Sequence, residues 1–269
     1  MAVSTMFEKM WKDYTDLNPN VLNVHKVFTD RNETVVNETV VNDHVAFRTY
    51  NDPRIGLKHY SQFFIKNGYT KKGEYHFKVK KLYAEHFEHA DPANPKIFIS
   101  ELLTEQLSAT AQKIISGLIS QMDFKKTTDD DFCISGRPWS VSFQDYETLL
   151  GESEYAAWMA AFGFRVNHFT VLVNALKTFN SLNEVNTAIK TAGLPLNTSG
   201  GEIKGSEEIG LAQSSTLATP VSVSFSDGQF KIPGCYYEFA HRFPVNGKLY
   251  NGFVEQSADK IFESTNVRK

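Results

Sequence analysis

Cysteine is scarce in this chain of 269 residues, which carries only Cys133 and Cys235. A secreted protein of this length would often carry more cysteines, in pairs that form disulfides. The N-terminal stretch does not read as a signal peptide, because Glu8 and Lys9 introduce charge before an apolar region can form. Together, these absences predict a cytoplasmic protein.

Long apolar runs and an excess of positive charge are also missing. No stretch approaches the roughly 20 consecutive apolar residues of a membrane span. A net charge of −3 and an isoelectric point near 6.2 lack the basic footprint of a nucleic-acid-binding protein. The chain has no glycine-rich phosphate loop and no low-complexity tract. We therefore expect neither a membrane nor a nucleic acid as a partner.

What is present is a globular composition with a metal-competent side chain in each of three short apolar segments. Hydrophobic residues make up 41% of the chain, enough for a single domain over residues 1–269 with a substantial core. The three segments are 41–50 around His44, 164–173 around His168 and 235–240 around Glu238. Two imidazoles and one carboxylate are the ligand set of non-haem Fe(II) oxygenases, which leave one face of the metal open. This set predicts one divalent metal per chain and a redox enzyme, with Fe(II) as the native ion and Zn or Ni able to replace it during purification.

The order of predicted elements repeats along the chain. Residues 40–102 and 164–243 each give a strand, a helix and further strands, and each begins on a histidine strand. In the second half the strands after the helix are expected at 211–218 and 221–225, followed by the Glu238 strand. We expect an α+β fold of two βαβββ units whose curved mixed sheets surround a metal cavity. Residues 103–163 form a helical insert outside it.

Strand alternation predicts which side chains share the cavity. Residues two apart on a strand face the same side, so His44 shares a face with Arg48, and Glu238 with Tyr236 and Arg242. Tyr236 and Arg242 are therefore candidates for pocket lining. If the two units pack as pseudo-symmetric halves, their first strands lie side by side and present both histidines to one pocket.

Several of these residues keep an alternative explanation. A single histidine on such a strand can be buried and hydrogen-bonded without a metal, and Glu238 can pair with Arg242 or Arg48. Glu101 lies on the last strand of the first unit, so it is either a fourth ligand, a partner that orients a ligand, or an ion-paired strand end. Arg48 suits a bidentate clamp on a substrate carboxylate, and its alternative is an ion pair with Glu101 or Glu238.

Three sequence motifs resemble those of a known family. The segments Asn42–Thr49, Asn167–Thr170 and Tyr237–Phe239 are similar to the signatures of the 2-oxoadipate dioxygenase/decarboxylase family, which is similar to the vicinal oxygen chelate superfamily. The resemblance implies that His44, His168 and Glu238 hold Fe(II).

The same resemblance implies that Arg48 binds a carboxylate of the substrate, a small 2-oxo acid. The implied reaction consumes 2-oxoadipate and O2 and yields 2-hydroxyglutarate and CO2, in lysine degradation. Two other classes remain open: a glyoxalase-like lyase or isomerase, and a non-enzymatic metabolite-binding protein of the same fold. We expect a monomer or a homodimer.

Overall fold

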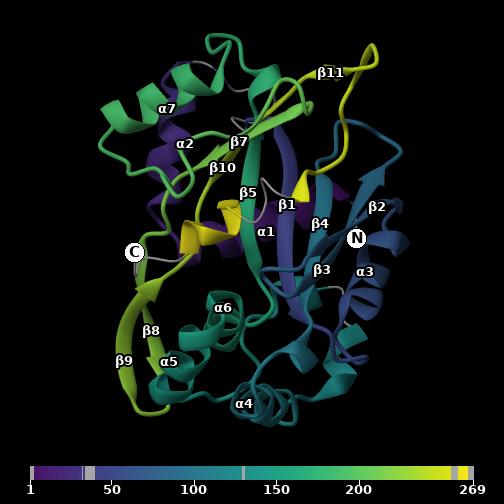
Figure 1. Cartoon of the computed structure of the whole chain (residues 1–269), viewed down its shortest axis with the longest axis vertical. Helices are drawn as coiled ribbons and strands as arrows, with labels where there is room; N and C mark the ends of the chain where they lie inside the picture. The colour runs from purple at the N-terminus through teal and green to yellow at the C-terminus, as the bar shows by residue number, and fades with distance from the viewer. Residues whose placement is uncertain (1–2, 32, 34–39, 129–130, 256–259, 266–269) are drawn as a thin grey trace.

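The chain folds around one curled mixed sheet, with helices on both faces (Figure 1). The computed structural model describes residues 3–31, 33, 40–128, 131–255 and 260–265. Eight strands form the sheet in the order β2-β3-β4-β1-β5-β10-β7-β6. Among these described residues, no helix is long and apolar enough to cross a membrane.

Two units of the same topology build this sheet. The first comprises β1 (Asn42–Tyr50), α3 (Leu57–Lys66), β2 (Tyr69–Phe77), β3 (Leu82–His89) and β4 (Lys96–Leu102). The second comprises β5 (Val166–Leu172), α7 (Leu182–Thr191), β6 (Lys204–Ser206), β7 (Leu211–Ser215) and β10 (Glu238–Arg242). In each unit the first strand pairs in parallel with the last, and the two first strands pair antiparallel at the centre. The α+β fold with two βαβββ units is therefore confirmed.

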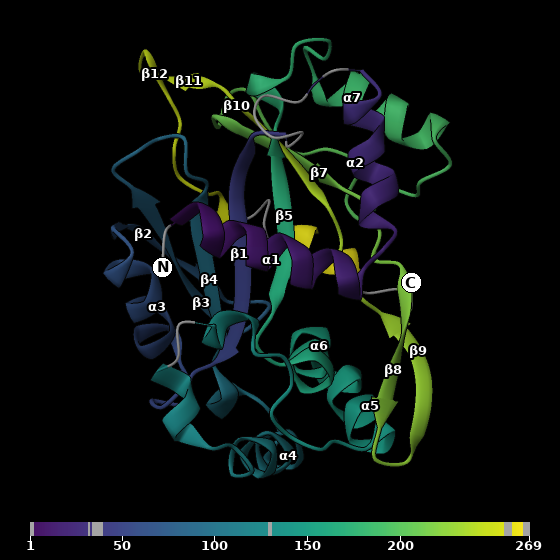
Figure 2. The ribbon, with the colours of Figure 1, turned by 180° about the vertical axis from the view of Figure 1, so that it is seen from behind.

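The central position of β1 and β5 explains their composition. Almost every residue of both strands is buried, so neither strand alternates between apolar and polar residues in the manner of a half-exposed strand. Helix α1 (Val3–Leu17) crosses one face, and Figure 2 shows it in front of β1 and β5. It buries Met6, Met10 and Tyr14 there. Helix α2 (Val21–Thr29) follows and contacts α7. The opposite face, here called the site face, carries the C-terminal residues, which are yellow in Figure 1.

One predicted strand lies elsewhere. Residues 221–225 were expected in the second unit, but β8 (Pro220–Phe225) pairs only with β9 (Gly228–Pro233) in a separate hairpin. The short β6 takes its place in the main sheet. The hairpin packs on α5 (Phe143–Glu152), where the rings of Phe143 and Phe230 stack with centroids 3.8 Å apart. The alternating serines Ser222 and Ser224 leave one side of β8 exposed, which suits a hairpin at the edge of the molecule.

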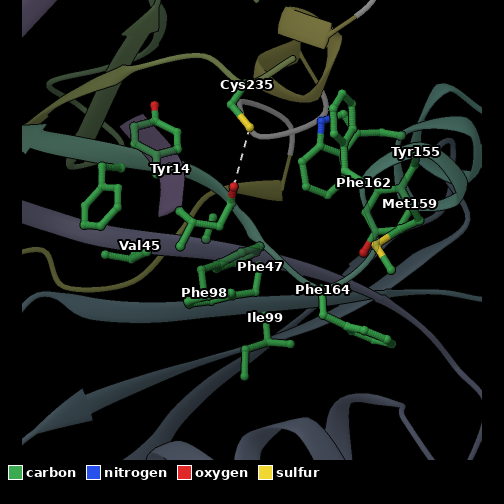
Figure 3. Close-up of a cluster of buried hydrophobic side chains, with 14 of the residues drawn as sticks. Tyr14, Val45, Phe47, Phe98, Ile99, Tyr155, Met159, Phe162, Phe164 and Cys235 are labelled. Carbon is green, nitrogen blue, oxygen red and sulfur yellow. Dashed lines mark hydrogen bonds between the residues drawn. The ribbon is translucent and has the colours of Figure 1, made fainter. Parts of the chain in front are cut away.

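The segment between the two units is helical, and its last helix enters the core. It contains α4 (Ala109–Ile119), α5 and α6 (Glu154–Phe162), with 3-10 turns η1 (Thr104–Gln106), η2 (Phe124–Thr128) and η3 (Phe132–Ile134). Residues 155–162 of α6 are all buried, because the helix is apolar on every side. Figure 3 shows Tyr155, Met159 and Phe162 of α6 in one cluster with Phe47 and Phe164. Residues 103–163 were expected to lie outside the cavity, but α6 of this segment packs inside the hydrophobic core.

Four small elements complete the described chain. The 3-10 turn η4 (Val173–Ala175) follows β5, and the short strands β11 (Pro244–Val245) and β12 (Lys248–Leu249) pair with each other after β10. The 3-10 turn η5 (Phe262–Thr265) lies at the C-terminal end.

Candidate metal centre

Three adjacent strands bring His44, His168 and Glu238 together on the site face. Thr170 of β5 is level with His44 on β1 and with Glu238 on β10, so these three residues form one row across the sheet. His168 lies two residues from Thr170 on the same strand and therefore points to the same face. One ligand atom from each of the two histidines and the glutamate lies within 4.8 Å of the others.

The geometry of this triad fits a single metal ion. The Nε2 atom of His44 lies 3.6 Å from Oε1 of Glu238, and Nε2 of His168 lies 3.3 Å from Oε2. Two ligand atoms that each lie about 2.1 Å from one metal, at angles near 90–110°, are roughly 3.0–3.4 Å apart. All three residues are at most 4% exposed. Small adjustments of the side chains would thus allow all three to coordinate one ion.

Hydrogen bonds select the histidine tautomer that a metal requires. Nδ1 of His44 lies 2.8 Å from the Asp43 carboxylate, and Nδ1 of His168 lies 2.9 Å from the side-chain carbonyl of Asn167. Both partners accept, so each Nδ1 carries the proton and each Nε2 presents a lone pair toward Glu238. The Thr170 hydroxyl, 3.1 Å from Nε2 of His44, then donates to that lone pair.

Burial favours the neutral form of every member of the triad. It lowers the pKa of His44 and holds the pKa of His168 well below its ordinary value. Burial also raises the pKa of Glu238 to about 8, although a hydrogen bond from Gln213 favours the charged form. Neutral imidazoles are the form that binds metals, and a divalent cation supplies the positive charge that a buried carboxylate otherwise lacks. The donor set therefore suits a metal chemically as well as geometrically.

Arg48 lies on the site face of β1, two residues beyond Ala46, and is fully buried. Its guanidinium lies against the rings of Tyr155 and Trp158, at 4.8 and 5.2 Å from their centroids. It is 3.4 Å from the Glu154 carboxylate and 3.5 Å from the Thr265 hydroxyl. The alternative explanation for Arg48 was an ion pair with Glu101 or Glu238, and the observed partner, Glu154, comes instead from the first turn of α6.

Glu101 lies away from the triad. It is level with Thr49 on β4, five residues along from the level of His44, which is about 16 Å of extended strand. The register assigns Phe98, opposite Ala46, as the counterpart of Glu238 in the first unit. The Glu101 carboxylate accepts a hydrogen bond of 2.7 Å from the backbone N–H of Leu57, at the start of α3. This position does not suit a fourth ligand or a partner of one.

The two predicted lining residues have different surroundings. The ring of Tyr236 stacks on His168, with centroids 4.5 Å apart, and its buried hydroxyl has no hydrogen-bond partner among the described residues. The charges of Glu238 and Arg48 both act on Tyr236, which therefore lies near the triad and near the arginine. The guanidinium of Arg242 instead pairs with Asp43, the residue that is hydrogen-bonded to Nδ1 of His44.

Several residues of the site were not predicted from the sequence. Asp43 and Asn167 each precede a histidine, and this repeated polar position was a signal that could have identified them. Gln213, Glu154 and Phe253 gave no such signal. Phe253 packs edge-on against His44 with ring centroids 4.8 Å apart, and its contact could not be inferred from a position 209 residues along the chain.

The fold and the buried triad together define an α+β protein with a candidate metal centre. One solved structure of this fold, a glyoxalase superfamily protein from Ralstonia eutropha, has a TM-score of 0.71 at 21% identity, covering 93% of this chain and 85% of the other. The family model for 2-oxoadipate dioxygenase/decarboxylase matches residues 1–130 and 132–248. The chain belongs to this family of enzymes.

Relatives with sequence identity above 30% agree with this membership. The chloroplastic 2-oxoadipate dioxygenase/decarboxylase of Arabidopsis thaliana is 34% identical over 279 residues, covering 94% of this chain and 74% of the relative. The structure of the Oryza sativa hydroxyglutarate synthase in complex with 2-oxoadipate has a TM-score of 0.89 at 32% identity, covering 98% of this chain and 91% of that one. A structure from Shewanella frigidimarina, provisionally named a hydrolase, has a TM-score of 0.89 at 48% identity, covering 94% and 98%.

Proposed function

We propose that this protein is a non-haem Fe(II)-dependent dioxygenase and decarboxylase of a small 2-oxo acid such as 2-oxoadipate. The observation that carries this proposal is the buried His44–His168–Glu238 triad, with the unpartnered Tyr236 hydroxyl and the cationic Arg48 near it. A substrate with a 2-oxo acid group at one end and a second carboxylate at the other matches this site. The 2-oxo acid group can chelate a metal at the triad, and the second carboxylate can pair with Arg48. The family membership and the 2-oxoadipate complex of the Oryza sativa relative support the same substrate class.

The reaction balances without a further co-substrate. 2-Oxoadipate and O2 give 2-hydroxyglutarate and CO2, so both atoms of O2 enter the products. Fe(II) held by His44, His168 and Glu238 would supply the chelation of the 2-oxo acid, the binding of O2 and the electrons for its activation. We propose that this reaction serves lysine degradation.

The chain's own residues orient the substrate and exclude water. Arg48 can donate two parallel hydrogen bonds to a carboxylate, and the rings of Tyr155 and Trp158 keep its guanidinium in place. The Tyr236 hydroxyl can donate to a substrate oxygen next to His168. Because Arg48 is fully buried, an incoming carboxylate would displace one of its present partners, the Glu154 carboxylate or the Thr265 hydroxyl.

Metal content and O2 uptake test this proposal. Protein purified without oxygen should contain one Fe(II) per chain by elemental analysis. Replacing His44, His168 or Glu238 with Ala should remove most of it, because two remaining ligands hold a divalent ion weakly. An O2 electrode should record uptake with 2-oxoadipate in the wild type and not in the three Ala variants.

Glu101→Gln is the matched control, since it alters a partly buried carboxylate that contacts Leu57 rather than the triad. It should keep its iron and its turnover. The proposal is refuted if the three Ala variants retain full iron, or if iron-loaded wild type consumes no O2 with any 2-oxo acid. Conversion of a substrate without O2 would favour the lyase alternative.

A further inference from the structure

The two histidines of the triad are held by the residues that precede them, but by different chemical groups. Asp43 offers a carboxylate to His44, whereas Asn167 offers a neutral amide to His168. The two units occupy equivalent places in the sheet, so the difference between Asp43 and Asn167 is a departure from pseudo-symmetry. A carboxylate on the remote nitrogen of a metal-binding histidine orients the ring and increases its basicity more than an amide does.

Arg242 provides the counter-charge that this carboxylate needs. Its Nε lies 2.5 Å from Oδ1 of Asp43, and one terminal nitrogen lies 2.8 Å from Oδ2. Both side chains are 1% exposed, and this two-point pairing occupies both carboxylate oxygens while Oδ2 also accepts from His44. A buried carboxylate would be costly without such a partner.

The same guanidinium reaches a second part of the chain. Its other terminal nitrogen donates to the backbone carbonyls of Tyr250 and Gly252, both at 2.9 Å. The next residue, Phe253, packs its ring edge-on against His44 at a centroid distance of 4.8 Å. These residues lie beyond residue 248, where the match to the family model ends. Arg242 therefore holds His44 from two directions, through Asp43 and through the segment 250–253.

We propose that Asp43 and Arg242 are a positioning pair that sets the strength of His44 as a metal ligand. This inference rests on the proposed metal centre and adds to it two residues that touch neither metal nor substrate. The pair fixes the Nδ1–H tautomer of His44 and docks segment 250–253 against the imidazole. Asn167 fixes the Nδ1–H tautomer of His168 but, among the described residues, docks no further segment against that ring.

Binding of Co(II) to the full-length, metal-free protein tests the pair without relying on turnover. Asp43→Asn leaves one acceptor oxygen for three donors and turns an amide N–H2 toward Arg242 or His44. We expect its Co(II) dissociation constant to rise by about tenfold to a hundredfold. The visible d–d bands of bound Co(II) should also shift, because a less basic His44 changes the ligand field.

Asp13→Asn is the matched control. It removes another Asp–Arg pair, with Arg165, on the opposite face of the sheet. It should leave both the dissociation constant and the spectrum of Co(II) unchanged, even if it lowers the unfolding temperature. Arg242→Lys keeps the charge but not the fork, and should weaken Co(II) binding severalfold. It carries the test if Asp43→Asn does not fold.

Two results would overturn the inference. One is a folded Asp43→Asn protein that binds Co(II) within twofold of the wild type and with the same spectrum. The other, where that variant does not fold, is wild-type affinity in Arg242→Lys. The triad variants keep this failure separate from failure of the metal centre: if His44→Ala loses Co(II) while Asp43→Asn does not, only the positioning role is wrong.

Discussion

Burial changes what each polar residue of the site can do. His44 and His168 are ordinary titrating groups in water, but in the core they stay neutral and available to a metal. Arg48 stays charged even when fully buried, because Glu154 and two aromatic rings replace its water. A buried cation whose ion pair is long, at 3.4 Å, can exchange that partner for a better-placed carboxylate.

Arg48→Lys should separate substrate binding from metal binding. The substitution keeps the charge but loses the planar fork, and Arg48 is not a ligand, so the iron content should stay at the wild-type level. The loss of a charge-assisted pair in an enclosed site costs on the order of 2–5 kcal/mol, so kcat/KM for 2-oxo acids should fall at least thirtyfold. Iron content and turnover are measured on the same preparation.

Arg54→Lys is the control for this experiment, since Arg54 pairs with Asp52 at the surface with half of its side chain exposed. It should not change kcat/KM. Unchanged kinetics in Arg48→Lys would instead assign Arg48 to a structural ion pair with Glu154.

At the scale of elements, the C-terminal turn η5 encloses the site. Hydrogen bonds connect its described residue Ser264 to the sheet: the Ser264 hydroxyl lies 2.7 Å from that of Ser215 on β7 and accepts from Asn197 at 2.9 Å. The next residue, Thr265, contacts both Arg48 and Glu154. Such hydrogen bonds can be replaced by hydrogen bonds to water, which allows this turn to move away from Arg48.

A disulfide between η5 and β7 should therefore block turnover reversibly. In the double variant Ser215→Cys, Ser264→Cys, the two sulfur atoms replace hydroxyls that already touch, and oxidation should lock the turn over Arg48. We expect the oxidised protein to lose most 2-oxo acid turnover at unchanged iron content, and a phosphine reductant to restore it. Cys133 and Cys235 are both buried and should not interfere.

Each single cysteine variant serves as the control, because it changes one hydroxyl without forming the bridge. Equal turnover in the oxidised and reduced double variant would show that the substrate reaches Arg48 without movement of η5.

At the scale of the whole molecule, the continuous sheet places further titratable groups in the interior. His86 on β3 is buried, with Nδ1 2.7 Å from the Tyr75 hydroxyl and Nε2 3.2 Å from Glu88. Burial lowers its pKa, although the Glu88 carboxylate favours the charged form. The folded protein thus keeps His86 neutral at a pH where the unfolded chain, with an ordinary pKa of about 6.5, binds a proton.

Stability should consequently fall in mild acid partly because of His86. Below about pH 6.5 the unfolded state binds more protons at this residue than the folded state, so the free energy of unfolding decreases as pH decreases. His86→Gln removes this contribution. Urea unfolding of metal-free protein at pH 7.5 and 5.5 should give a smaller decrease for the variant than for the wild type.

His76→Gln is the comparison, on the exposed side of the neighbouring strand β2. It should lose stability between the two pH values as the wild type does. An equally steep decrease in His86→Gln would exclude His86 as a source of the acid sensitivity.

The sequence by itself determined the parts of this protein that depend on neighbouring residues. Short apolar segments predicted β1, β5 and β10, and helical spacing predicted α3, because both patterns follow from local backbone geometry. The repeated histidine motif also predicted that two such strands would be equivalent. The proximity of His44, His168 and Glu238 followed from placing those strands side by side.

Only the tertiary structure decided which distant groups meet. Register made Phe98, not Glu101, the counterpart of Glu238, and a shift of three residues along β4 leaves no trace in the local pattern. Arg48 meets Glu154 across 106 residues, and Arg242 meets Asp43 across 199. Pairing of buried charges depends on the packing of the whole chain, because any of several carboxylates could satisfy the same arginine until the fold excludes all but one.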